Sequence, residues 1–245
     1  MVIFVEKEAL LKKSFALRDG KAKIYVVTTG AKERVERVKS YFDGIDFSFI
    51  FSDDFGFLET QEKKYESVSH KFRQKSLMAG EIGAFKTHSY AWEVVAKSGR
   101  PAVIIEDNVE FLKPPCMLLD KKIVDLIERC GVISFTDFSF KMNHESPFLI
   151  SSVLMRKPLP IVCYGITPER AMSLLKAMEK NPYVLPVDKW LSIPKLCGCC
   201  CFLSPVSFAK RAGDVSSIAN KRKGKKTYNP FNFFCRILNK IRYRY

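Results

Sequence analysis

Three polar side chains come directly after a short apolar segment near the middle of the chain. The segment Ala102–Ile105 (AVII) is followed at once by Glu106, Asp107 and Asn108. Acidic groups at the end of a buried segment are costly unless water, a partner or a cation stabilises them. Their oxygens suit Mg²⁺ or Mn²⁺, and such a cation can hold a diphosphate and neutralise the charge that builds on it. Acids in this place are also common as solvated turn residues, so the motif alone leaves both interpretations open.

A second polar group follows an earlier apolar segment. The run Lys23–Thr29 (KIYVVTT) stops at Gly30, which leaves Thr28 and Thr29 at the end of a predicted strand. In open α/β sheets, ligands bind beyond the carboxyl ends of the strands. No glycine-rich dinucleotide fingerprint and no phosphate-binding glycine loop ending in lysine follows any predicted strand. The pattern therefore disfavours a nicotinamide-dependent dehydrogenase and a P-loop enzyme.

Strand-like and helix-like segments alternate along the chain, and they must position these groups. Apolar or β-branched runs predict strands, and apolar residues at helical spacing predict helices. The expected strands cover residues 23–29, 47–51, 102–105, 131–136 and 161–166, and the expected helices cover 31–42, 81–97, 119–129 and a segment that begins at Thr167-Pro168. Residues 53–79 and 138–160 are predicted to be largely irregular. The alternation predicts an α/β fold with an open, mostly parallel sheet flanked by helices.

Eight cysteines are present, and four of them form the run CGCCC: Cys197, Cys199, Cys200 and Cys201. Structural zinc sites usually combine two separated couples of Cys or His, and no second couple stands near this run. The sequence favours reduced thiols in a buried strand or turn, with a metal site as the alternative.

The positive charge is concentrated at the C-terminal end of the chain. The 245 residues carry a formal net charge of +15. Residues 210–245 hold eleven Lys and Arg against one acid, so the tail carries +10 and the rest only +5. The pattern indicates two parts, a body at 1–209 and a basic tail at 210–245. The tail favours an anionic partner, and nucleic acid and an acidic membrane surface both qualify.

The end of the tail has an amphipathic pattern. At about 100° per residue, one arc collects apolar side chains and another collects basic ones. The apolar arc contains Phe231, Phe234, Ile237, Leu238, Ile241 and Tyr245. With the preceding KRKGKK run, this composition is typical of a helix that lies on an anionic membrane surface. The alternative is a helix that packs on the body.

Composition and hydropathy limit the protein class further. Hydrophobic residues make up 47% of the chain and charged residues 27%, which is typical of a globular protein and excludes a disordered or collagen-like one. No apolar run reaches the ~20 residues of a membrane span. The first twenty residues lack the basic start and long apolar stretch of a secretory signal, so we expect a cytoplasmic protein.

The stretch 79–110 reads AGEIGAFKTHSYAWEVVAKSGRPAVIIEDNVE. It combines a Gly-Glu-x-Gly turn, a helix with His and then Ala-Trp, a proline, and an apolar strand that ends in acids. The matching residues are Gly80, Glu81, Gly83, His88, Ala91, Trp92, Pro101, Glu106 and Asp107. This order resembles the central signature of glycosyltransferase family 25, which includes bacterial lipooligosaccharide galactosyltransferases. The resemblance extends back to Ile24–Arg37 and forward to Cys163–Ala177 and Leu185–Asp188, and spans about residues 22–218.

The resemblance implies a GT-A-type fold and inverting transfer of a sugar, most simply galactose, from a UDP-sugar to a lipooligosaccharide or glycolipid acceptor. Together with the amphipathic tail, it leads us to expect a cytoplasmic protein that is peripheral on the inner face of the cytoplasmic membrane. By position, it implies Asp188 as catalytic base and Glu81 as second candidate, although both are also suited to capping a helix. It implies donor binding by Thr28, Thr29, Arg34, Arg37, Gly83, His88, Glu106 and Asp107, Mn²⁺ or Mg²⁺ binding by Asp107 and Asn108, and acceptor binding by Tyr164 and Gly165.

Two positions depart from the family pattern. Asn108 stands where the family usually has a second aspartate, and Thr87-His88 replaces Ser-His. An asparagine oxygen still ligates a hard cation but without a formal charge, so weaker metal binding is expected. Two alternatives follow: an inactive relative that only binds sugar nucleotide or glycan, and a nucleic-acid-binding protein that uses the basic tail with its aromatic residues.

Overall fold

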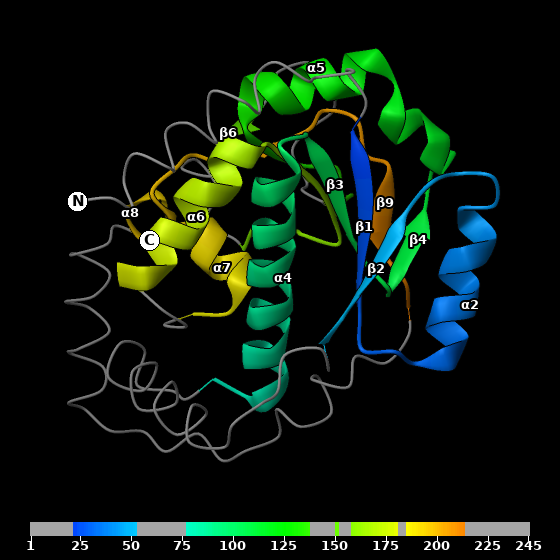
Figure 1. The fold of residues 1–245 in the computed structure, drawn as a ribbon, viewed down its shortest axis with the longest axis horizontal. Coiled ribbons are helices and arrows are strands. Elements are labelled where there is room, and N and C mark those ends of the chain that lie inside the picture. Colours follow the sequence, from blue (N-terminus) through cyan, green and yellow to red (C-terminus); the bar gives the residue numbers. More distant parts are fainter. Residues whose placement is uncertain (1–21, 53–76, 138–149, 152–157, 181–184, 214–245) are drawn as a thin grey trace.

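We describe the protein from a computed structural model, which describes residues 22–52, 77–137, 150–151, 158–180 and 185–213. Within these ranges the chain forms an α/β fold around one large sheet (Figure 1). The predicted irregular segments and the amphipathic tail fall almost entirely outside the described residues, so the expectations about them stay predictions.

The described part of the large sheet has seven strands. Their spatial order is β2 (Ser48–Phe51), β1 (Lys23–Thr28), β3 (Ala102–Glu106), β7 (Cys163–Ile166), β5 (Val132–Ser134), β8 (Phe202–Leu203) and β6 (Ile150–Ser151). β1 pairs in parallel with β2 and β3, and β5 pairs in parallel with β8. β7 runs antiparallel to β3 and β5, and β6 runs antiparallel to β8. The mostly parallel sheet is therefore confirmed, with a reversed strand in its middle that the sequence pattern did not predict.

Helices cover both faces of the sheet (Figure 1). One face carries α4 (Ala79–Ser98), α6 (Pro168–Lys180), α7 (Val187–Leu191) and α8 (Pro194–Cys197). The other face carries α2 (Lys32–Tyr41), the 3₁₀ helix η2 (Pro115–Leu119) and α5 (Lys121–Cys130). We call these the α4 face and the α2 face. Each predicted helix is present within two residues of its expected start, and Thr167 caps α6 by accepting a hydrogen bond from the Arg170 backbone N–H at 3.3 Å.

The period of two in the strands divides the core between the faces. In β1, Tyr25 and Val27 pack on the α4 face, whereas Ile24 and Val26 pack on the α2 face. β3 follows the same rule and is fully buried from residue 102 to residue 105, as expected for a strand covered on both faces. Consecutive residues at its end must therefore point to opposite faces.

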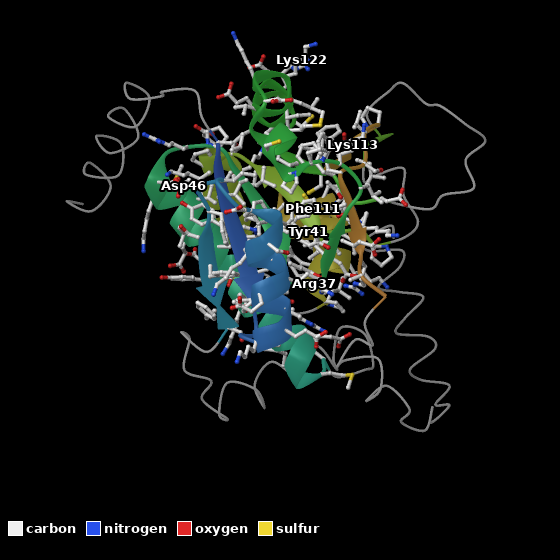
Figure 2. All side chains as sticks on the ribbon, turned by 90° about the vertical axis from the view of Figure 1, so that its right-hand side faces the viewer. Arg37, Tyr41, Asp46, Phe111, Lys113 and Lys122 are labelled. Carbon is white, nitrogen blue, oxygen red and sulfur yellow. The ribbon has the colours of Figure 1, made fainter. Side chains whose placement is uncertain are left out.

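A two-stranded ribbon stands beside the main sheet. It pairs β4 (Val109–Phe111) antiparallel with β9 (Ala209–Arg211). Phe111 packs edge-on against Tyr41 of α2, with ring centroids 5.2 Å apart (Figure 2). The ordered body therefore continues through β9, across the predicted boundary at residue 209. Within the described ranges no helix has both the length and the apolar character that crossing a membrane would need.

Candidate active site

The carboxylate of Asp107 lies on the α2 face and joins three segments. Its Oδ2 accepts hydrogen bonds from the Thr28 hydroxyl at 2.7 Å and the Thr29 backbone N–H at 3.3 Å. Its Oδ1 accepts one from Nη1 of Arg34 at 3.2 Å, and Nη2 of Arg37 donates to the Asp107 backbone oxygen at 3.3 Å. The side chain of Asp107 is only 7% exposed. Asp107 therefore fastens the end of β1 and the first turns of α2 to the end of β3.

The surface next to Asp107 carries two arginine side chains and is suited to binding an anion. Thr29 and Gly30 are exposed directly above Asp107, and the guanidinium groups of Arg34 and Arg37 are half-buried beside them. The Asp107 carboxylate holds the Arg34 guanidinium, and the Asp107 backbone oxygen holds that of Arg37, so both planar groups have a fixed orientation at this surface. The geometry supports the prediction that these arginines bind a diphosphate. The role of Asp107 as a metal ligand stays a prediction, since its carboxylate accepts three hydrogen bonds and a cation would have to share its oxygens with these donors.

Glu106 points to the opposite, α4 face, where it ends a buried chain of hydrogen bonds. Nε1 of Trp92 donates to the Tyr164 hydroxyl at 2.9 Å. The Tyr164 hydroxyl lies 2.9 Å from Nδ1 of His88, and Nε2 of His88 lies 3.4 Å from Oε1 of Glu106. Because Trp92 can only donate, the Tyr164 hydroxyl accepts from it, and the two nitrogens of His88 then contact Tyr164 on one side and Glu106 on the other. His88 is thereby held in one orientation toward Glu106.

The surroundings of Glu106 favour its ionised form. Burial by itself raises the pKa of a carboxyl group. Here the hydrogen bond and charge of His88, the charge of Arg211 and a hydrogen bond from Asn108 outweigh that effect, so the pKa of Glu106 is lowered. Nη2 of Arg211 lies 3.6 Å from Oε2 of Glu106. Glu106 is therefore an anion at neutral pH.

Tyr164 contacts His88 and Trp92 through its hydroxyl and so helps to hold His88 in place. It is fully buried, and burial together with the negative charges of Glu106 and Cys201 raises its pKa beyond its ordinary value, against a hydrogen bond from Trp92 that lowers it. The hydroxyl consequently keeps its proton and remains a donor to His88. This position supports a positioning role, whereas the predicted contact with an acceptor finds no support in it.

Two further carboxylates act on the same side of the sheet. Glu81 caps α4 through Oε2, which accepts the Met78 backbone N–H at 3.0 Å. Asp188 is half-buried at the start of α7, where its Oδ1 accepts the Lys189 backbone N–H at 2.8 Å. The capping interpretation is confirmed for Glu81, whereas Asp188 is the second residue of α7, whose N-cap is Pro186, and only accepts the N–H of its neighbour.

The pKa of Asp188 is raised above its ordinary value. The main cause is burial, and the negative charges of Glu106 and Glu81 add to it, while the Lys189 N–H and the charge of Arg211 act in the opposite direction. A carboxylate with a raised pKa is a stronger base, which is what the removal of a proton from an alcohol requires. Asp188, Glu106 and Glu81 come from three distant parts of the sequence and meet electrostatically at this edge of the sheet.

Asn108 points to the same face as Glu106, two residues away. It donates to the Glu106 side chain, and its Oδ1 is buried without a hydrogen-bond partner among the described residues. An unsatisfied buried oxygen next to an ionised carboxylate is a feature that a cation would relieve. One carboxylate and one amide oxygen also fit Mg²⁺ or Mn²⁺ when a diphosphate supplies the remaining oxygens. The residues that fit a cation best are therefore Glu106 and Asn108.

The two glycines predicted in the site have different surroundings. Gly83 is half-buried inside α4, and a Cβ built on it meets no atom within 4 Å. Gly165 lies within β7, where a Cβ would come 2.4 Å from Ile127 and 3.1 Å from Phe135. The Gly165 position therefore faces the packed α2 side of the sheet, which supports a packing role and not the predicted acceptor contact.

These surroundings predict opposite effects of alanine. Gly165→Ala should destabilise the protein by about 1–3 kcal/mol, because the methyl group overpacks the core between β7 and α5. Gly83→Ala, the matched control, should stabilise it by up to about 1 kcal/mol, because alanine favours a helix interior and has room there. Urea unfolding of both variants measures the difference. Equal stability of Gly165→Ala and the native protein would contradict the packing role.

Arg211 is a site residue that the sequence pattern did not single out, and Trp92, which matches the family signature, was assigned no role in the site. Arg211 falls in the segment assigned to the basic tail, and only the pairing of β4 with β9 brings it to Glu106. Trp92 was predicted as a core residue, and it is one, but its indole N–H also holds Tyr164. No signal in the sequence links Arg211 to Glu106, because about a hundred residues separate them.

The fold and the site together define an α/β protein with two fixed arginines and a group of carboxylates at the carboxyl edge of its sheet. In open α/β sheets this edge is where ligands bind. Residues 21–191 match the model of glycosyltransferase family 25 (LPS biosynthesis protein). The chain therefore belongs to glycosyltransferase family 25. A search of curated proteins gave no match.

Proposed function

We propose that this protein is an inverting glycosyltransferase that moves galactose from UDP-galactose to a lipooligosaccharide or glycolipid acceptor. Membership of the family supports sugar transfer in LPS biosynthesis. The observation that carries the proposed proton transfer is Asp188, a half-buried carboxylate whose pKa is raised by burial and by the charge of Glu106, while Arg34 and Arg37 lie on the opposite face of the same sheet edge. The open sheet with its site at the carboxyl ends of β1 and β3 fits the GT-A type.

In this proposal each group has one task. Asp188 accepts the proton of the acceptor hydroxyl while that oxygen attacks the anomeric carbon from the side opposite the leaving diphosphate. Arg34 and Arg37 hold the diphosphate and stabilise the charge that develops on it. Glu106 stays ionised and, by its charge, keeps the pKa of Asp188 high.

A divalent cation, when bound by Glu106 and Asn108, supplies additional neutralisation of the diphosphate charge. His88 keeps Glu106 in one orientation through the chain that starts at Trp92. The donor-binding role proposed for His88 is therefore exerted through Glu106.

The proposal is tested by incubating the purified protein with a panel of UDP-sugars and a lipooligosaccharide or galactoside acceptor, with and without Mn²⁺. We expect UDP release with UDP-galactose and a product whose anomeric configuration, read by NMR, is opposite to that of the donor. Binding without turnover would favour the inactive relative. Binding of nucleic acid with no effect of any sugar nucleotide would favour the nucleic-acid-binding alternative.

Asn108→Asp should tighten the binding of Mn²⁺, because it places a second carboxylate beside Glu106 where the native protein has a neutral oxygen. Isothermal titration of Mn²⁺ in the presence of UDP measures the change. Asp120→Asn, an exposed change at the N-terminus of α5 on the other face of the sheet, serves as the control and should leave Mn²⁺ binding unaltered. An unchanged affinity in Asn108→Asp would mean that residue 108 does not contact the cation.

We further propose that the basic tail holds the protein at the cytoplasmic face of an anionic membrane, where a glycolipid acceptor lies. Deletion of residues 221–245 should release the protein from vesicles that contain anionic lipid, because it removes both the KRKGKK run and the apolar arc. Transfer to a lipid-embedded acceptor should fall, while transfer to a soluble acceptor sugar persists. High salt should reproduce part of the release. An insoluble or unfolded truncated protein would show instead that the tail packs on the body.

A further inference from the structure

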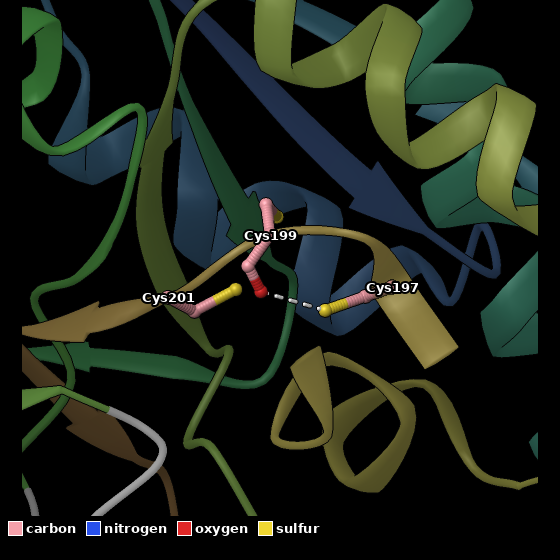
Figure 3. Close-up of side chains that lie close together, drawn as sticks. All are labelled: Cys197, Cys199 and Cys201. Atoms are coloured by element: carbon pink, nitrogen blue, oxygen red, sulfur yellow. Dashed lines mark hydrogen bonds between the residues drawn. The ribbon is translucent and has the colours of Figure 1, made fainter. Parts of the chain in front are cut away.

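Three cysteine thiols converge in the core at the end of α8. Cys197, Cys199 and Cys201 are buried, with exposed fractions of 0%, 6% and 0%. Their sulfur atoms all lie within 4.8 Å of one another (Figure 3). Cys200, in the same run, is exposed. Among the described residues, this is the one group of three or more Cys, His, Asp or Glu side chains with its ligand atoms so close together.

The backbone explains the convergence. Cys197 is the last residue of α8, and Gly198 then adopts φ +74°, a left-handed conformation that turns the chain back. From there the chain runs extended into β8, so Cys199 and Cys201 share one side and Cys200 takes the other. The C-x-C-x-C spacing thus directs three thiols to one point and excludes the fourth.

The surroundings are apolar, and the three cysteines belong to the same core cluster as Trp190 and Tyr164. The Cys197 thiol donates to the Cys199 backbone oxygen at 3.1 Å (Figure 3). It also lies 3.6 Å from the Leu191 backbone oxygen. The group therefore lies between α7, α8 and β8.

We propose that Cys197, Cys199 and Cys201 form a three-thiolate site for a thiophilic d¹⁰ cation, either Zn²⁺ or Cu⁺. Zn–S bonds of about 2.3 Å place sulfur atoms about 3.8 Å apart, so the present sulfurs need to approach one another by at most about 1 Å. A donor set of sulfur alone selects soft cations over Mg²⁺, Mn²⁺ or Ca²⁺. Each thiol gives its proton to solvent as its metal–sulfur bond forms, so the step needs no oxidant.

Such a site would stabilise the segment that carries Asp188. The cation would tie the end of α8 to the start of β8, and α8 packs on α7, which begins with Val187 and Asp188. Its ligand set differs from that of the proposed Mg²⁺ or Mn²⁺ position, which offers only oxygen ligands. Its role is therefore structural, and it contributes no group to the sugar transfer.

The test uses the full-length reduced protein, loaded with Zn²⁺ or with Cu⁺ in separate anaerobic titrations against a competing chelator. We expect one ion per chain after gel filtration, measured by mass spectrometry of the metal, and a rise in the thermal unfolding temperature. Replacement of Zn²⁺ by Co²⁺ should give intense sulfur-to-cobalt charge-transfer absorption. The arm with the higher affinity identifies the preferred ion.

Cys199→Ser should lose the bound ion, the charge-transfer band and the thermal shift, whereas Cys200→Ser, the matched control one residue away, should keep all three. If Cys199→Ser fails to fold, alkylation of the native protein decides, because the metal should protect the buried thiols from iodoacetamide and leave Cys200 reactive. Retention of the ion in Cys199→Ser, no stoichiometric ion in either titration, or a disulfide within the run in place of metal binding would overturn the proposal.

Discussion

Asp188→Asn should lower the rate of sugar transfer by about 10²–10⁴-fold, the usual contribution of a general base. The asparagine keeps the Oδ1 acceptor for the Lys189 backbone N–H, so the start of α7 should be preserved. The variant loses the negatively charged carboxylate that accepts the proton of the acceptor hydroxyl. The KM for the UDP-sugar should change little, because Asp188 itself is not among the proposed donor contacts.

The pH dependence of transfer gives an independent measurement of the same role. Because the base acts ionised, kcat/KM should fall as the pH drops through the pKa of Asp188, which is raised above its ordinary value of 3.8. This acid limb should be missing from the residual activity of Asp188→Asn. Asp125→Asn, an exposed change of the same charge on α5, is the control and should behave as the native protein. Full activity in Asp188→Asn would remove Asp188 from the mechanism.

Asp107→Asn should destabilise the protein and also abolish most of the transfer. An asparagine has a single acceptor oxygen, so its NH₂ group must face either the Arg34 guanidinium or the donors of Thr28 and Thr29. Breaking a buried ion pair in this way costs about 3–5 kcal/mol, because it leaves the partner charge uncompensated. The arginines would then lose their orientation toward the diphosphate, and the KM for the donor should rise.

Urea unfolding and donor titration of Asp107→Asn measure the two effects separately. Asp46→Asn is the matched control, because Asp46 also pairs with a cation at 3.0 Å but its side chain is 80% exposed (Figure 2). Water screens such a pair, so the control should unfold like the native protein. An Asp107→Asn variant of normal stability that loses only Mn²⁺ binding would instead support Asp107 as a metal ligand.

Much of the fold could be predicted from the sequence, because its elements have strong periodic patterns. The apolar run before Glu106 predicted β3, and the spacing of apolar residues in 81–97 predicted most of α4. The direction of β7 could not be predicted, because an apolar run predicts a strand but does not indicate whether the strand runs parallel or antiparallel to its neighbours. The pairing that places Arg211 beside Glu106 depends on tertiary contacts that no local pattern encodes.

Most residues of the candidate site were predicted from the sequence, but their distribution over the two faces of the sheet was not. Glu106 and Asp107 were expected to act together at the strand end, yet neighbouring residues of a strand point to opposite faces. The structure accordingly separates an arginine-binding carboxylate, Asp107, from a His88-bound carboxylate, Glu106. The period of two was available in the sequence, and applied to β3 it would have indicated this separation.

The reversed strand β7 has a consequence for the order in which the protein assembles during synthesis. β7 pairs with β3 on one side and with β5 on the other, although both neighbours precede it in the chain. Until Cys163–Ile166 leave the ribosome, β3 and β5 each present an unpaired edge, which is a template for wrong pairing with other chains. The same segment brings Tyr164, so His88 acquires its hydrogen-bond partner only when the sheet closes. A nascent chain that stops before β7 can therefore hold the arginine side of the site but not the side that carries the proton-accepting groups.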